Sequence, residues 1–198
     1  MRFEPASTES AFSLLEVLFV VAIILLVTVL YWAGPSGAKG KQNKQLCREN
    51  LEKLYIPLEI YANEHSGKFP EKAGAVNSED VLDSLVPKYS VDTSLFICPG
   101  SKDEQLPSGE SIAKRKISYS YYMGRKPGEY GDALMTDAQI NTLSKAPGQQ
   151  AFSTNNLPPG NNHKSGGNVL FADGHVDSTP PLAAFSLATT SGVVLLNP

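Results

Sequence analysis

The chain has 198 residues, enough for one domain and an anchor, and 41% of them are hydrophobic and 19% charged. Charge is unevenly placed, because the segment 14–32 (LLEVLFVVAIILLVTVLYW) holds only two polar side chains, Glu16 and Thr28. Beyond it, sixteen basic and seventeen acidic residues nearly cancel. This balance gives no reason to expect nucleic acid or an acidic substrate as a partner.

The first predicted element is an apolar helix. Residues 12–32 form a run of 21 residues, about 32 Å long as a helix, which matches the roughly 30 Å hydrocarbon core of a bilayer. A cleaved signal peptide would have a shorter apolar region followed by a small-x-small site. The segment 33–37 (AGPSG) follows instead and is expected to break the helix at the membrane surface. These features favour a transmembrane helix over 12–33.

A second, amphipathic helix is predicted over 38–66. Apolar side chains recur at intervals of four and three residues and define one face. They are Cys47, Leu51, Leu54, Leu58 and Tyr61. Charged residues occupy the other faces, and Pro57 is expected to kink this helix or end its regular part.

Residues 67–198 are predicted to form a small, β-rich domain with many loops, because most of the 14 Pro and 16 Gly lie there. The predicted elements are a helix over 81–85 started by Ser78, strands at 95–98, 117–123 and 133–136, a loop over 144–162, and a hairpin over 168–176. Asp173-Gly174 suits the tight hairpin turn. We expect Tyr119, Tyr121 and Tyr122 to pack in the sheet. The fold class is α+β, with the long N-terminal helix packed on a small antiparallel sheet.

The chain has two cysteines, Cys47 and Cys98, and neither belongs to a CxxC pair or to a metal-ligand spacing. Outside the cytoplasm they are expected to form one disulfide. It would close a loop of about fifty residues, worth roughly 3–4 kcal/mol by chain entropy. In the cytoplasm, two buried free thiols are the alternative.

Glu16 is an acid near the start of the apolar segment. An ionised carboxylate in lipid costs several kcal/mol, so it needs a partner or a function. The alternative is that Glu16 lies at the membrane interface and is hydrated.

Residues 11–16 (AFSLLE), followed by the apolar run, resemble the start of type IV pilins and type II secretion pseudopilins. The resemblance implies that a prepilin peptidase cuts between Ala11 and Phe12, that 1–11 is a leader, and that the new amino group of Phe12 is methylated. It also implies that Glu16 pairs with the amino terminus of a neighbouring subunit during filament assembly.

Later segments look like a pseudopilin-like branch of the same family. They are 47–51 (CRENL), 61–70 (YANEHSGKFP), 96–99 (FICP) and an H-x9-DG pattern, in which His163 precedes Asp173-Gly174. Three features depart from the family: Ala11 replaces the usual Gly, the leader has one basic residue, and a basic cluster follows the apolar run. That cluster alone would place the C-terminal side in the cytoplasm. We favour export, because the cleavage motif and the cysteines agree.

The expected function is therefore structural rather than enzymatic, with no cofactor. The subunit would span the inner membrane once, with its C-terminal domain in the periplasm or in an extracellular filament. Its expected partners are copies of itself and related subunits, the prepilin peptidase/methyltransferase, the inner-membrane assembly machinery and membrane lipid.

The alternative is a membrane-anchored periplasmic enzyme or binding module that uses a divalent cation. Its candidate ligands are His163, Asp173 and His175, with Asp137 as a fourth. Oxygen-rich ligands would favour calcium and a His pair a transition metal. The simpler interpretation gives these residues local roles: Asp173 serves the turn, His175 lies in a strand, and His163 hydrogen-bonds the hairpin.

Overall fold

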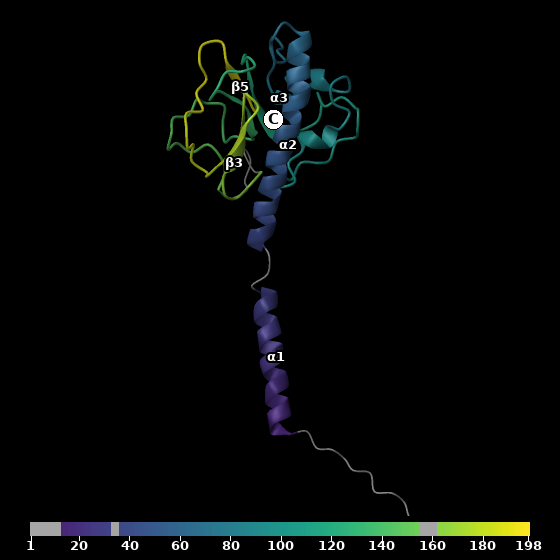
Figure 1. Cartoon of the computed structure of the whole chain (residues 1–198), viewed down its shortest axis with the longest axis vertical. Helices are drawn as coiled ribbons and strands as arrows, with labels where there is room; N and C mark the ends of the chain where they lie inside the picture. The colour runs from purple at the N-terminus through teal and green to yellow at the C-terminus, as the bar shows by residue number, and fades with distance from the viewer. Residues whose placement is uncertain (1–12, 33–35, 155–161) are drawn as a thin grey trace, which may run out of the picture. The chain divides into compact units, whose positions relative to one another are not determined.

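The computed structural model describes residues 13–32, 36–154 and 162–198. Its contacts divide the chain into two units, Met1–Gly37 and Ala38–Pro198. Figure 1 shows the helix of the first unit and the helix-and-sheet fold of the second. The predicted leader, Phe12 and part of the 144–162 loop lie outside the described residues.

The first unit contains the apolar helix α1 (Leu14–Trp32). The stretch Leu14–Tyr31 is long and apolar enough to cross a membrane once, a property that a signal sequence shares. The Thr28 hydroxyl donates a 2.8 Å hydrogen bond to the Leu25 carbonyl of the same helix. This polar side chain is therefore satisfied within α1, as an apolar surrounding requires.

The second unit is organised by α2 (Ser36–Glu64), which confirms the predicted amphipathic helix. Its apolar stripe is buried, with Cys47, Leu51, Leu54 and Leu58 fully inaccessible. The helix continues through Pro57. It ends where the Gly67 N–H donates to the Ala62 carbonyl at 2.8 Å, with Gly67 at a φ of 73°.

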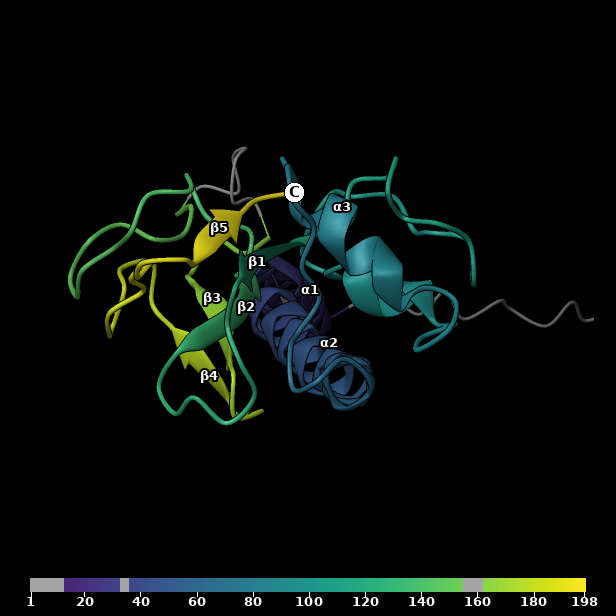
Figure 2. The same ribbon diagram turned by 90° about the horizontal axis from the view of Figure 1, so that it is seen from above.

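The sheet is antiparallel, as predicted, and has the strand order β4-β3-β2-β1-β5. Its strands are β1 (Tyr119–Met123), β2 (Ala133–Asp137), β3 (Gly167–Phe171), β4 (Val176–Thr179) and β5 (Val194–Leu196). In Figure 2, α2 lies between the sheet and the segment that carries α3 (Ser78–Leu82). The helix therefore has a packing partner on two sides.

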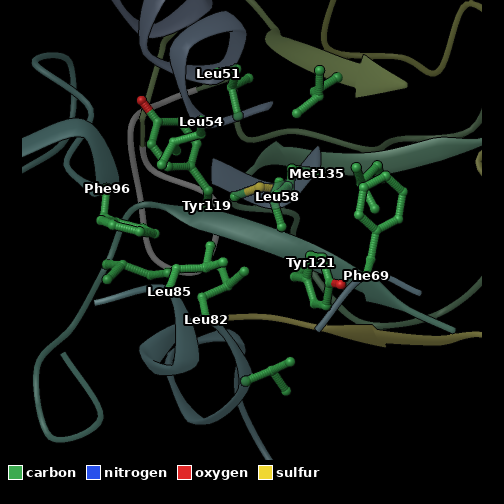
Figure 3. Packing of buried hydrophobic residues seen from close by; sticks show 14 of the residues in the cluster. Leu51, Leu54, Leu58, Phe69, Leu82, Leu85, Phe96, Tyr119, Tyr121 and Met135 are labelled. Carbon is green, nitrogen blue, oxygen red and sulfur yellow. The ribbon is translucent and has the colours of Figure 1, made fainter. Parts of the chain in front are cut away.

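The main core fills the space around α2. Figure 3 shows Leu51, Leu54 and Leu58 of this helix beside Tyr119 and Tyr121 of β1. Leu82, Leu85 and Phe96 close the core from the α3 side. A smaller cluster, which includes Tyr122, Val169 and Phe171, packs under the C-terminal loops. The three predicted sheet tyrosines are thus all buried, on two faces of β1.

Two local predictions were wrong, and a third differs only in where the element begins. Residues 95–98 are not a strand, because Thr93–Phe96 forms a 3-10 helix whose first turn is capped by the Asp92 carboxylate at the Ser94 N–H. The short helix was predicted over 81–85 with Ser78 before it, but α3 begins at Ser78, and Asn77 is its N-cap. The predicted strand over 117–123 begins two residues later, at Tyr119.

The β3–β4 hairpin is confirmed, and its turn rests on α2. Gly174 has a φ of 93°, and the Tyr55 hydroxyl donates to the Ala172 carbonyl at 3.3 Å. A Cβ added at Gly174 would lie 2.7 Å from the Tyr55 ring. The turn therefore needs glycine for its backbone and for the close approach of Tyr55.

We expect Gly174→Ala to lower the free energy of unfolding more than Gly148→Ala does. Both glycines have positive φ, 93° and 85°, but a Cβ at Gly148 meets nothing within 4 Å. Backbone strain costs about 1–2 kcal/mol at each site, and displacing Tyr55 adds about 1–3 kcal/mol at Gly174 alone. Denaturant unfolding measures both losses. Equal losses would mean that the hairpin does not depend on its contact with Tyr55.

Candidate functional site

A disulfide joins α2 to the loop after the 3-10 helix Thr93–Phe96. Cys47 and Cys98 are bonded, with their Cα atoms 5.1 Å apart, which confirms the predicted pairing. Two side-chain amides of the same helix strengthen this junction: Asn43 donates to the Pro99 carbonyl (3.0 Å) and Asn50 to the Ile97 carbonyl (3.1 Å). One face of α2 is therefore fixed to the loop by a covalent bond flanked by hydrogen bonds.

Asp137 lies beside this junction, at the end of β2, and only 1% of its surface is exposed. One carboxylate oxygen accepts hydrogen bonds from the backbone and side-chain N–H groups of Asn168, at 2.6 and 3.0 Å. The other accepts from the Asn162 side chain at 2.7 Å. Three donors stabilise a charge whose burial would otherwise be costly. Asn168 reaches Asp137 because antiparallel pairing places the start of β3 beside the end of β2.

His163 completes a buried cluster with Asp137 and the disulfide. Its Nε2 lies 3.5 Å from a carboxylate oxygen of Asp137 and 3.4 Å from the Cys98 sulfur. A Cβ at Gly100 would come within 2.6 Å of the imidazole ring, so only glycine leaves room for it. Burial lowers the pKa of His163 below its ordinary value, although the Asp137 charge opposes this shift. The imidazole is therefore held neutral near pH 7.

Lys44 brings a positive charge to the same region from α2. Its ammonium donates to the carbonyls of Thr179 (2.7 Å) and Ser165 (3.3 Å). Burial lowers the Lys44 pKa, and the charge of Asp137 partly offsets that effect. The Asn168 side chain also donates to the Lys44 carbonyl at 3.0 Å. The cluster thus links α2 to both strands of the β3–β4 hairpin.

Asp173 and His175 form a separate, partly exposed pair at the hairpin turn. The Asp173 carboxylate accepts from the backbone N–H of His175 at 3.2 Å and contacts the imidazole Nδ1. The imidazole stacks on Phe171 with ring centroids 4.2 Å apart. Asp173 therefore serves the turn, as expected from the sequence.

The four candidate cation ligands do not form one group. Among the described residues, one group of His, Cys, Asp or Glu side chains brings three or more possible ligand atoms within 4.8 Å of one another. Its members are Cys47, Cys98, Asp137 and His163. Asp173 and His175 are not in this set. His163 contacts the disulfide and Asp137, whereas the sequence suggested a hydrogen bond to the hairpin. The sequence did not predict that Asn162, Asn168 and Lys44 belong to this site, because isolated amides and a basic residue in a charged stretch carry no distinctive spacing.

Glu16 lies in the first turn of α1, where a negative charge favours the helix dipole. Ser13 precedes the helix, and its hydroxyl accepts from the Leu15 N–H at 3.3 Å. The Glu16 side chain is exposed and makes no hydrogen bond or ion pair with any described residue. Ala11 and Phe12, the expected cleavage residues, lie outside the described part of the chain.

Comparison of the chain with protein-family models, curated proteins and solved structures finds no match.

We expect the stability of the folded unit to fall as the pH drops below about 6.5, partly because of His163. Its pKa is lower in the folded chain than in the unfolded chain, so between these two values the unfolded state binds more protons. This one group contributes a slope of at most about 1.4 kcal/mol per pH unit, which disappears once the pH is below both values.

His163→Gln should flatten the pH dependence in that window, as measured by thermal unfolding from pH 7.5 to 5. His65→Gln, at an exposed histidine, is the matched control and should keep the wild-type slope. If His163→Gln keeps the full slope, burial of neutral His163 is not its source.

Proposed function

We propose that the chain is a structural subunit of a type IV pilus-like or type II secretion pseudopilus filament. The observation that carries the proposal is α1, an apolar helix with exposed side chains and a single carboxylate, Glu16, in its first turn. The helix can lie in a membrane as a monomer and against the same helix of other subunits in a filament. Its lack of a polar face supports both surroundings.

In this proposal, Glu16 forms the charge pair that joins one subunit to the next. In an apolar bundle an unpaired carboxylate is costly, so a cation must accompany it. Cleavage between Ala11 and Phe12 would create one, an amino group four residues before Glu16. The amino terminus of an incoming subunit would then pair with Glu16 of its neighbour. Repeated head-to-tail pairing gives an open helical assembly rather than a closed ring.

The folded unit supports an exported location. Its disulfide is typical of an oxidising compartment. Two basic residues after α1 also have roles within the fold, since Lys44 binds the hairpin carbonyls and Arg48 pairs with Glu52 at 3.0 Å. Their presence is therefore explained without a cytoplasmic location. In this proposal the prepilin peptidase/methyltransferase, the inner-membrane assembly machinery and lipid are the partners.

Replacement of Glu16 by Gln tests the pairing directly. The variant should accumulate in the membrane normally, because removing a charge favours insertion. Filament assembly should fail, since loss of one member of a buried charge pair costs about 3–5 kcal/mol, or more than a hundredfold in an equilibrium constant. The filament content of a sheared-cell fraction measures this.

Thr28→Val is the matched control for Glu16→Gln. It removes the Thr28 hydroxyl, whose hydrogen bond stays within the helix, and it should assemble like wild type. If Glu16→Gln also assembles like wild type, Glu16 is an interfacial residue and the proposed charge pairing is rejected. Absence of filaments of the wild-type chain from the sheared fraction would reject the filament proposal itself.

The mature chain should begin at an N-methylated Phe12, as measured by mass spectrometry of protein extracted from membranes. Ala11→Gly, which introduces the residue usual in the pilin family, should be cleaved at least as completely. An intact Met1, or a terminus near Gly37, would show that the N-terminal segment is not processed as proposed.

A further inference from the structure

The two disulfide sulfurs belong to a group of four potential metal ligands. All four ligand atoms, from Cys47, Cys98, Asp137 and His163, lie within 4.8 Å of one another, and all four residues are buried. From the His163 Nε2, the Cys98 sulfur is 3.4 Å away and the nearer Asp137 oxygen 3.5 Å. Ligands bound to one tetrahedral Zn²⁺ at about 2.0–2.3 Å are separated by roughly 3.3–3.8 Å. The His163 nitrogen already lies at such spacings from the Cys98 sulfur and the Asp137 oxygen.

We propose that the dithiol form of this chain binds one Zn²⁺ through Cys47, Cys98, His163 and Asp137. Two thiolates, an imidazole and a carboxylate form a mixed tetrahedral set, and thiolates favour zinc over calcium or magnesium. The proposal is independent of filament formation, because it concerns only the second unit.

The surrounding residues hold the ligands in place. Asp137 is fixed by Asn162 and Asn168, and the His163 ring is confined by its close approach to Gly100. Hydrogen bonds and packing of this kind orient metal ligands and raise affinity. The ligands would thus need little reorganisation beyond separation of the two sulfurs.

The charges also balance. Two thiolates and one carboxylate carry three negative charges, Zn²⁺ carries two positive charges, and the Lys44 ammonium supplies the third. Lys44 is held nearby by the Thr179 and Ser165 carbonyls and interacts with the charge of Asp137. A buried site with no net charge avoids the penalty of an uncompensated ion.

The disulfide and the bound metal are alternative cross-links between Cys47 and Cys98. A dithiol reductant gives two electrons to the Cys47–Cys98 bond and becomes a disulfide itself, while each sulfur takes up a proton. Zn²⁺ then displaces both thiol protons. Cys98 is among the residues that line a surface hollow of about 400 Å³, together with Asn50 and Asp103. Either cross-link connects α2 to the loop that carries Cys98.

The test uses the full chain in detergent, reduced with a phosphine and titrated with Co²⁺ as a spectroscopic substitute for Zn²⁺. We expect one Co²⁺ per chain, with thiolate-to-cobalt charge-transfer absorption and the visible bands of tetrahedral cobalt, and displacement by Zn²⁺. The oxidised chain should show neither signal. Zn²⁺ should also raise the melting temperature of the reduced chain and leave that of the oxidised chain unchanged.

Substitutions identify the non-sulfur ligands. His163→Ala and Asp137→Asn should each weaken Co²⁺ binding by about tenfold or more. The matched controls, His175→Ala and Asp173→Asn, change the other Asp–His pair and should keep wild-type affinity. The proposal is overturned if reduced wild type gives no tetrahedral cobalt spectrum, if Zn²⁺ does not raise its melting temperature, or if all four variants bind alike.

Discussion

Burial of one face of α2 is the constraint on which the folded unit depends. Leu51, Leu54 and Leu58 face the sheet and the α3 segment together, and none has any exposed surface. Full burial of a leucine is worth about 1.5–3 kcal/mol. The sheet alone leaves the other side of this stripe in water, so the 78–98 segment must pack against it. That requirement explains why a region with little regular structure contributes so much to the core.

The disulfide and the polar cluster extend this packing to the end of α2 that the leucines do not cover. Cys47 is one turn before Leu51, and its bond to Cys98 fixes the 93–98 loop against the helix. Asp137, Asn168 and Lys44 then connect that turn to β2 and to the β3–β4 hairpin. Since the charged groups of Asp137 and Lys44 have hydrogen-bond partners within the chain, the cluster specifies how the helix lies on the sheet without leaving an unpaired buried charge.

Sequence patterns predicted the elements that periodicity or turn chemistry determines. The spacing of the α2 stripe identified its buried face, and Asp173-Gly174 identified the hairpin. The pattern failed at 95–98, where the apolar run is too short to separate strand from 3-10 helix and the Asp92 cap decides the outcome. It named Asp137 and His163 as candidate ligands but missed Asn162 and Asn168, which are 25 and 31 residues from Asp137 and reach it only in the folded chain.

Two carboxylates in this chain illustrate one physical rule with different solutions. Asp137 is buried in the folded unit, and three N–H donors of the same chain satisfy it. Glu16 lies in an apolar helix whose described residues offer it no hydrogen bond or ion pair. In the proposed filament, burial among other helices would remove the water that otherwise hydrates this carboxylate. A cation from outside the helix would then have to take the place of that water, and the amino terminus that the proposed cleavage creates at Phe12 would supply it. Within that proposal, the requirement for a partner follows from the desolvation of Glu16.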